Sequence, residues 1–310
     1  MKVLFMGTPD FAAGALKSLI DNGHEVVLVV TQTDKPKGRG KEVQFTPVKK
    51  VALEHGIEVF QPVKAKEPES VAKLRESNAD VFVVAAYGQI LTQEILDIPR
   101  YGCVNIHASL LPKYRGAAPI QWSIIDGEEV TGVTTMLMDV GLDTGDMLDK
   151  VEVPIADDET GGTLHDKLME AGAKLIIDTL EKLENGTITR IKQNDEDSCY
   201  AKMLDKKMGN IDFSNPAWKI ERLIRGLNPW PSAYTRIKGK NLKIYQAKVI
   251  YEEYEGIPGE IVYIDKNSMY IKTGDGILDV KNLQLEGKKA MDIADFLRGN
   301  NIEKGTILGE

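Results

Sequence analysis

Strand-length apolar runs alternate with helix-length amphipathic segments through the first 110 residues of this chain. Valine-rich runs with few polar breaks are typical of strands buried on both faces, and helices between them indicate parallel crossover connections. We expect strands at Val3 to Met6, Glu25 to Thr31, Ile57 to Gln61, Asp80 to Ala86 and Gly102 to His107, and helices at Phe11 to Asn22 and Glu67 to Ser77. The pattern predicts an α/β fold on a doubly wound, mostly parallel sheet.

The middle of the chain predicts additions to this sheet. Val130 to Met138 and Met147 to Val153 fit antiparallel strands, and Thr160 to Leu183 fits a long packing helix. A chain of 310 residues is long for one core, which favours two domains. We expect a catalytic-type domain over residues 1–203 and a second domain over residues 204–310, with a short linker near residues 204–210.

The last hundred residues have a different pattern. A helix from Pro216 to Leu227 is stopped by a Pro-rich turn, and Met291 to Arg298 predicts a closing helix. Between them, short β-type runs lie at Ala233 to Ile237, Leu242 to Val249, Gly259 to Tyr263, Ser268 to Thr273 and Gly276 to Val280. Gly, Asp and Asn breaks between these runs predict a small β-barrel.

Composition narrows the class of protein. With 42% hydrophobic and 28% charged residues the chain has an ordinary globular composition. No segment approaches the roughly 20 apolar residues that span a bilayer, and the first apolar run is too short for a signal peptide. Cys103 and Cys199 give neither a disulfide framework nor metal-ligand spacing, so we expect a cytoplasmic protein without a metal and without a membrane partner.

The charge distribution bears on a nucleic-acid partner. The net charge of −8 argues against one, because Lys and Arg dominate phosphate binding. However, residues 206–310 carry 17 Lys and Arg against 14 Asp and Glu, while the preceding part has a net charge of −11. The segment from Asp34 to Lys50 is also basic and contains Gly-Arg-Gly around Arg39. A solvated loop and a phosphate-binding loop both fit this segment.

Three polar residues are the strongest candidates for chemistry: Asn105, His107 and Asp143. Asn105 and His107 are two positions apart on an expected strand, so their side chains lie on the same face. They also lie at the carboxyl end of that strand, which is where ligands bind in open α/β sheets. An amide, an imidazole and a carboxylate suit amide-forming acyl transfer. The alternatives are a structural histidine and an Asp143 that only shapes a turn before Gly145. No Gly-x-Ser-x-Gly motif or recognisable cysteine nucleophile is present.

The turn after the first strand invites comparison with dinucleotide-binding proteins. Their fingerprint needs three spaced glycines for close approach to a pyrophosphate. Only Gly7 is present here, and Pro9 removes a backbone donor. We interpret the turn as structural, with NAD binding as the lesser alternative.

The segment from Asn105 through Ser-Leu-Leu-Pro to Gln121, together with Leu-Asp-Thr-Gly-Asp ending at Asp146, resembles the 10-formyltetrahydrofolate-dependent formyltransferases. Met-Gly-Thr-Pro-Asp-Phe ending at Phe11, the basic segment and the second domain extend the resemblance nearly end to end. They are similar to the members that act on tRNA. The resemblance implies a Rossmann-like catalytic domain, an OB-like second domain, and formyl transfer from 10-formyltetrahydrofolate to the α-amino group of methionyl initiator tRNA.

The resemblance also implies roles for particular residues. Asn105 and His107 would donate to the oxyanion of the tetrahedral intermediate, and a carboxylate beside His107 would favour its cation. Asp143 would take the proton from the attacking amine. The folate pocket would contain Tyr87, Gly88, Gln89, Ile90, Ser109, Leu110, Leu111 and Pro112. The basic segment would contact the tRNA through Lys35, Lys37, Arg39 and Lys41. Apart from the resemblance, cations of the second domain could add phosphate contacts: Arg222, Arg225, Lys238, Lys240 and Lys243.

Two alternatives share part of this evidence. A formyltransferase acting on a sugar-nucleotide amine or glycinamide ribonucleotide would use the same three residues, although the second domain and the basic segment disfavour it. A non-catalytic RNA-binding module would explain the barrel but not the grouped Asn, His and Asp. We expect the protein to act as a monomer.

Overall fold

The computed structural model describes residues 1–37 and 42–309, which form two compact units. The first contains residues 1–119, 130–154 and 165–201, and the second contains residues 120–129, 155–164 and 202–310. The units are therefore not contiguous in sequence, because two short stretches inside the first 203 residues belong to the second unit. None of the helices in the described ranges has the length and apolar character needed to cross a membrane.

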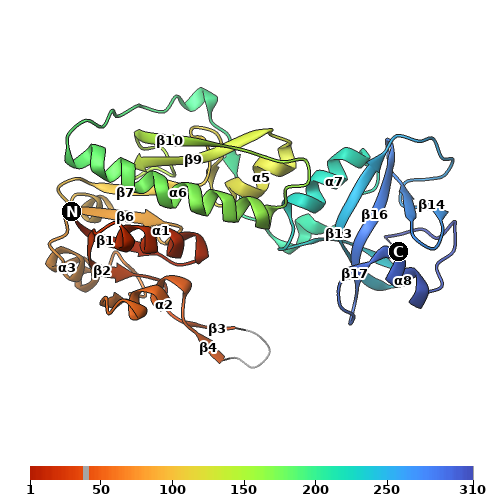
Figure 1. Cartoon of the computed structure of the whole chain (residues 1–310), viewed down its shortest axis with the longest axis horizontal. Coiled ribbons are helices and arrows are strands. Elements are labelled where there is room, and N and C mark those ends of the chain that lie inside the picture. The colour runs from red at the N-terminus through yellow and green to blue at the C-terminus, as the bar shows by residue number, and fades with distance from the viewer. Residues whose placement is uncertain (38–41, 310) are drawn as a thin grey trace. The chain divides into compact units, whose positions relative to one another are not determined.

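A seven-stranded sheet forms the centre of the first unit (Figure 1). Its strands are β1 (Lys2–Gly7), β2 (Glu25–Val30), β5 (Val59–Phe60), β6 (Val81–Ala85), β7 (Cys103–His107), β9 (Val130–Leu137) and β10 (Met147–Pro154). The strand order is β10-β9-β7-β6-β1-β2-β5, in which the pairs from β7 to β5 are parallel and β9 and β10 are antiparallel additions. This confirms the doubly wound sheet predicted from the alternating pattern.

The chain reverses its direction of winding between β1 and β6, where ligands bind in open sheets. At this edge Thr8 Oγ1 and Gln32 Nε2 each donate to the Tyr87 carbonyl at 3.1 Å. A Cβ on Gly7 would lie 2.5 Å from Ala12 Cβ, so glycine is required for the helix to approach the strand. These contacts give the turn after β1 a structural role.

Helices cover both faces of the sheet. They are α1 (Asp10–Asp21), α2 (Pro47–Glu54), α3 (Pro68–Glu76), α4 (Gln93–Leu96) and α6 (Gly161–Glu184). Only residues 165–184 of α6 lie in this unit. Leu74 of α3 and Ile95 of α4 share a buried cluster with Phe82 and Cys103. The opposite face carries α6, which packs against α1 where Ser18 Oγ donates to the Ala173 carbonyl at 2.6 Å.

Part of the basic segment is more ordered than its composition indicates. Strands β3 (Lys35–Lys37) and β4 (Glu42–Gln44) form a hairpin, and α2 follows with Thr46 Oγ1 as its N-cap acceptor. Lys49 pairs with Asp34 and donates to Gln61 Oε1 at 2.8 Å. Burial alone would raise the pKa of Asp34, but hydrogen bonds from Lys49 and Gln61 lower it below its ordinary value. Lys49 therefore anchors the hairpin and is not a free cation.

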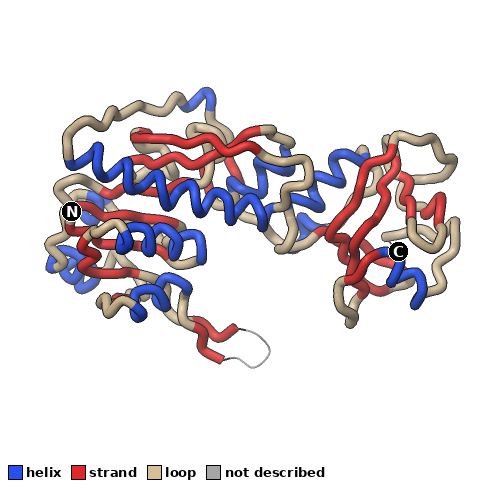
Figure 2. Tube along the Cα trace, viewed as in Figure 1, coloured by secondary structure: helices blue, strands red, loops and turns tan. Residues whose placement is uncertain are grey.

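Strands form most of the regular structure in residues 202–309 (Figure 2), and they pair in the antiparallel direction. The strands are β12 (Ala233–Ile237), β13 (Lys240–Ile250), β14 (Ile261–Ile264), β15 (Met269–Lys272), β16 (Ile277–Leu285) and β17 (Met291–Asp292). They form a six-stranded sheet in the order β12-β13-β16-β15-β14, with β17 beside β16. The helices of the second unit are α5 (Pro119–Asp126), α7 (Ala217–Gly226) and α8 (Ile293–Gly299). Ile220 and Ile224 of α7 and Phe296 of α8 fill its core.

Three shorter features complete the chain. Strands β8 (Arg115–Gly116) and β11 (Tyr200–Ala201) pair in parallel in the first unit, near the 3-10 turn η1 (Asp195–Asp197). Another 3-10 turn, η2 (Lys206–Gly209), lies where we expected a linker, and the next residue, Asn210, bridges to Tyr234 of β12. The linker segment is therefore hydrogen-bonded structure.

Candidate active site

Asn105 and His107 lie on one face of β7. In the antiparallel pairing, Asn105 is opposite Met136 and His107 is opposite Thr134. The intervening Ile106 faces α6, because a Cβ on Gly172 of that helix would lie 3.0 Å from Ile106 Cγ2. The two polar side chains therefore point to the other face, as the two-residue period predicts. They are buried, with 9% and 6% of their surface exposed.

The His107 ring has a partner at each nitrogen. Nε2 lies 2.9 Å from the Tyr114 carbonyl oxygen, which can only accept, so Nε2 carries a proton and donates it. Nδ1 lies 3.7 Å from Asp143 Oδ2. This distance suits an ion pair but exceeds a direct hydrogen bond. Nδ1 therefore remains available to donate to a further group when the ring is protonated.

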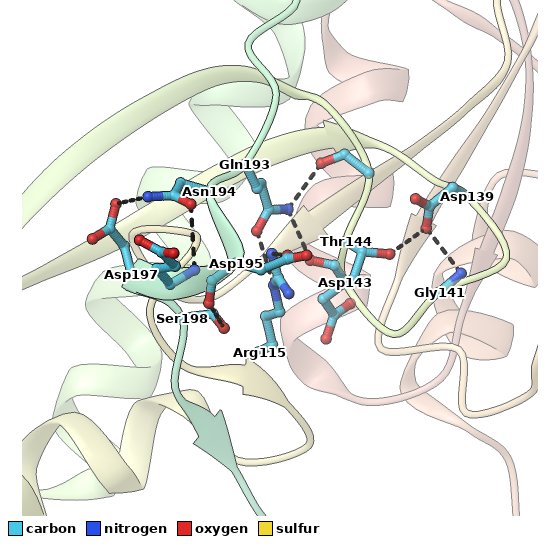
Figure 3. Close-up of polar contacts among 12 residues, drawn as sticks. Arg115, Asp139, Gly141, Asp143, Thr144, Gln193, Asn194, Asp195, Asp197 and Ser198 are labelled. Carbon is cyan, nitrogen blue, oxygen red and sulfur yellow. Dashed lines mark hydrogen bonds and ion pairs between the residues drawn. The ribbon is translucent and has the colours of Figure 1, made fainter.

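Asp143 lies in the loop between β9 and β10 with a left-handed backbone, φ 55°. Its Oδ2 accepts from Gly116 N at 2.8 Å. The loop's turn is shaped instead by Asp139, whose Oδ1 accepts from Gly141 N at 2.9 Å and Thr144 Oγ1 at 2.7 Å (Figure 3). The Asp143 carboxylate is therefore committed to a distant segment and to His107, not to an Asx-turn.

Two further residues surround this loop. Arg115 Nε donates to Gln193 Oε1 at 3.0 Å, and Gln193 Nε2 donates to the carbonyls of Asp143 and Gly145, each at 2.8 Å (Figure 3). Neither Arg115 nor Gln193 was among the site residues expected from the sequence. No motif or periodicity in the polar segment around Gln193 could have identified it.

The expected folate residues follow two neighbouring strands. Residues 87–90 leave the carboxyl end of β6 and residues 109–112 leave that of β7, so both segments emerge at the same edge of the sheet. Thr134 Oγ1 holds residues 109–112 in place, because it donates to the Ser109 carbonyl at 2.7 Å and accepts from Leu111 N at 3.1 Å. Leu111 is buried, whereas Gly88 is exposed and Leu110 and Pro112 are partly exposed.

The residues after β6 differ in their freedom to bind a ligand. The Tyr87 hydroxyl is buried and has no hydrogen-bond partner among the described residues, and burial raises the pKa of Tyr87 to about 12. Gln89 is occupied, because its side chain accepts from Ala65 N at 2.7 Å and donates to the Pro62 carbonyl at 3.2 Å. Ile90 is 85% exposed, which is unusual for a large apolar side chain.

The candidate tRNA residues fall into two groups. In the first unit, Lys35 and Lys37 lie on β3, with Lys35 exposed, whereas Arg39 and Lys41 lie outside the described residues. The expected tRNA contacts of Arg39 and Lys41 therefore remain a prediction from sequence.

In the second unit the candidate cations have different surroundings. Arg225 is engaged by Glu221 and donates to the Glu159 carbonyl at 2.9 Å, which competes with any phosphate. Arg222 lies over the Trp218 ring, 5.0 Å from its centroid. The Lys238 ammonium donates to the Asn301 carbonyl at 3.1 Å. Lys240 is exposed and Lys243 is half-buried.

Within residues 1–37 and 42–309, no group of three or more His, Cys, Asp or Glu side chains could hold a metal ion.

Comparison with known proteins identifies the family. A family model described as formyl transferase matches residues 1–180, and one described as formyl transferase, C-terminal domain, matches residues 203–301. The chain belongs to the formyl transferase family. The resemblance inferred from the Asn105, His107 and Asp143 motifs is confirmed.

Individual relatives agree. Over 309 residues the chain is 58% identical to a methionyl-tRNA formyltransferase of Agathobacter rectalis, covering 99% of both chains. It is 54% identical over 310 residues to a methionyl-tRNA formyltransferase of Alkaliphilus metalliredigens, covering 100% of this chain and 99% of the relative. Among solved structures, an N-formyltransferase from Helicobacter canadensis, in complex with folinic acid and dTDP-3-aminofucose, superimposes with a TM-score of 0.67 at 21% identity. That match covers 90% of this chain and 99% of the other, and shows a shared fold.

Proposed function

We propose that this protein transfers the formyl group of 10-formyltetrahydrofolate to the α-amino group of methionyl initiator tRNA, giving N-formylmethionyl-tRNA. The observation that carries the proposal is the convergence of Asn105 and His107 with Asp143, whose Oδ2 is 3.7 Å from His107 Nδ1. Full-length identity above 50% to methionyl-tRNA formyltransferases supports the choice of acceptor. The structural neighbours that act on sugars are similar at only 21–22% identity, so they do not favour a sugar acceptor.

The folate would bind at the edge where β6 and β7 end. Exposed Ile90 and partly exposed Leu110 offer apolar surface for a pterin and its aryl ring, and backbone groups near Gly88 can read the pterin edge. The Tyr87 hydroxyl, which has no hydrogen-bond partner within the described residues, supports this assignment, because a buried polar group without a partner is costly in the free protein. Ser109, Leu111 and Pro112 would shape the opposite wall, and Gln89 would hold residues 62–65 in place.

The chemistry follows from the atoms available. The neutral amine attacks the formyl carbon and forms a tetrahedral intermediate with a negative oxygen. The Asn105 amide donates to this oxygen, as does His107 through Nδ1–H, because Nε2 is already committed to the Tyr114 carbonyl. Such donors are typically worth about 3 to 4 kcal/mol each in the transition state. The bond from the carbon to N10 of the folate then breaks.

Asp143 transfers a proton from the attacking amine to N10 of the folate. The attacking amine loses a proton as the new carbon–nitrogen bond forms, and the departing N10 gains one. The Asp143 carboxylate accepts the first proton, directly or through a water molecule, and returns it to N10. Its Oδ2 also lies 3.7 Å from His107 Nδ1, within ion-pair distance. Gly116 N, which donates to Oδ2, keeps the carboxylate oriented.

The acceptor would be held by both parts of the chain. We assign catalysis and aminoacyl binding to residues 1–203 and tRNA binding to residues 204–310. In the first part the basic segment with Lys35, Lys37, Arg39 and Lys41 would contact tRNA phosphates. In the second part Arg222, Lys238, Lys240 and Lys243 are candidate contacts, and Arg225 only if it leaves its Glu221 partner. We further propose a cytoplasmic monomer.

The proposal is tested by incubating purified protein with 10-formyltetrahydrofolate and charged initiator tRNA. Formylmethionine released from the tRNA is the expected product. An amino-sugar nucleotide in a parallel reaction distinguishes the acceptors, and its formylation in place of methionine would overturn the proposal. His107→Ala should abolish turnover while tRNA affinity stays unchanged. A protein that binds tRNA without any turnover would instead be a binding module.

A further inference from the structure

We propose that Gln193 is a positioning residue for Asp143, and that Arg115 in turn fixes Gln193. Neither side chain is assigned to touch the substrate. The effect on rate rests on the proposed function, whereas the effect on the loop conformation does not. The two residues and the loop they hold are drawn in Figure 3.

The Gln193 amide bridges two carbonyl groups of the loop. Nε2 donates to the Asp143 carbonyl and to the Gly145 carbonyl, each at 2.8 Å. An amide nitrogen has two N–H groups, so both are used. The bridge spans Thr144, the residue after Asp143. Asp143 itself has a φ of 55°, a left-handed conformation that non-glycine residues adopt infrequently and that surrounding contacts help to hold. Gln193 supplies two of these contacts.

The orientation of the amide follows from its other partner. Oxygen and nitrogen of a glutamine side chain are assigned from their hydrogen bonds, and here the assignment has one solution. Arg115 Nε can only donate, so Gln193 Oε1 faces it at 3.0 Å, and the nitrogen must face the carbonyls. Arg115 also pairs with Asp195 at 2.8 Å, but Asp195 is 82% exposed and contributes little.

These contacts close a ring of residues. Arg115 and Gly116 are consecutive on β8, and Gly116 N donates to Asp143 Oδ2 at 2.8 Å. The same short strand therefore holds the side chain of Asp143 directly and its main chain through Gln193. Without Gln193, β8 holds Asp143 through the Gly116 bond to its side chain and no longer through its main chain, so the carboxylate can move relative to His107. Because a misplacement of about 1 Å can cost on the order of 100-fold in rate, this ring matters for catalysis.

The variants are chosen to separate positioning from general loosening. Gln193→Ala removes both donors. Gln193→Glu keeps the size and the acceptor for Arg115 but places an oxygen against two carbonyls. Asn194→Ala is the matched control, because Asn194 caps η1 through Glu196 N and bonds Asp197, and within the described residues its side chain makes no hydrogen bond to the Asp143 loop.

The kinetic experiment measures formyl transfer to charged initiator tRNA. Gln193→Ala and Gln193→Glu should lower kcat by about 10- to 100-fold, with KM for both substrates within about two-fold. Asn194→Ala should keep the wild-type kcat. In an Asp143→Asn background, Gln193→Ala should lower kcat less than about two-fold, because it acts through the Asp143 carboxylate. The positioning role would be overturned if the loss of kcat in the double variant equalled the product of the losses in Gln193→Ala and Asp143→Asn. It would also be overturned if Gln193→Ala kept the wild-type kcat.

A second measurement does not depend on activity. Hydrogen exchange of the Gly116 amide reports its bond to Asp143 Oδ2. We expect Gln193→Ala to speed this exchange at least about 10-fold, and Asn194→Ala to leave it unchanged. Unchanged Gly116 exchange in Gln193→Ala would overturn the proposal even if wild-type protein formed no formylmethionine. Absence of formylmethionine from the wild-type reaction, with faster Gly116 exchange in Gln193→Ala, would count against the proposed function and not against the positioning role.

Discussion

Replacing Thr134 by valine tests how the segment that follows the catalytic strand is held. Thr134 is fully buried on β9. Its Oγ1 donates to the Ser109 carbonyl at 2.7 Å and accepts from Leu111 N at 3.1 Å. Valine has nearly the same shape but offers neither a donor nor an acceptor. The substitution therefore removes two hydrogen bonds while leaving the packing of the strand intact.

The expected magnitude follows from the two backbone groups left behind. A buried polar group that loses its partner costs about 1 to 3 kcal/mol. Ser109 is fully buried and Leu111 is buried, so neither backbone group is freely solvated. Allowing for partial relaxation of residues 109–112, we expect the free energy of unfolding of the first unit to fall by about 2 to 4 kcal/mol. The displaced segment should also raise KM for the folate donor.

The change in the free energy of unfolding is measured by urea denaturation of the wild-type and variant proteins. The unfolding is followed by a spectroscopic signal that arises from the first unit. Thr131→Val is the matched control, because Thr131 is buried on the same strand and makes no side-chain hydrogen bond to the described residues. The control should change stability by less than about 1 kcal/mol. Equal stability of Thr134→Val and wild-type protein, or equal loss in both variants, would refute the reasoning.

Two further predictions concern titratable groups. Cys103 is buried, which raises its pKa to about 12, whereas Cys199 is exposed. Iodoacetamide at pH 8 should therefore modify Cys199 alone in the native protein and both thiols in urea, as read by peptide mass spectrometry; equal native labelling would contradict this. The pKa of Asp34 is lowered in the folded protein. Its pairing with Lys49 therefore contributes fully to the free energy of unfolding at pH values above the unfolded-state pKa near 3.9, and this contribution is lost as the pH falls through the folded-state pKa. The stability difference between wild-type protein and Asp34→Asn should be constant from about pH 5 to 8 and shrink below about pH 4, and a difference that persists unchanged to pH 2 would be inconsistent with it.

Much of the first unit could be predicted because its signals are local and periodic. Valine-rich runs such as Val81–Ala85 are buried on both faces, which only a covered parallel sheet allows. The two-residue spacing of Asn105 and His107 fixed their common face before any tertiary information was needed. In the second unit, the strand runs were separated by turn residues and were recovered with shifts of a few residues at their ends.

The unpredicted features depend on contacts between distant residues. His107 Nε2 donates to the carbonyl of Tyr114, a residue whose φ of 58° local propensity does not favour for a tyrosine. Gln193 lies 50 residues after Asp143 in a polar segment without periodicity. Asp139 and Asp143 both precede loop glycines, and only the fold shows which of them makes the turn.

The most direct test of the central claim is the single-turnover rate of formyl transfer in Asn105→Ala, measured with both substrates bound. If Asn105 and His107 donate to the same oxyanion beside Asp143, the rate of the chemical step should fall about 100- to 1000-fold while folate and tRNA affinities stay within about two-fold. A rate within about three-fold of wild type would contradict the claim that these residues meet around the transferred carbon.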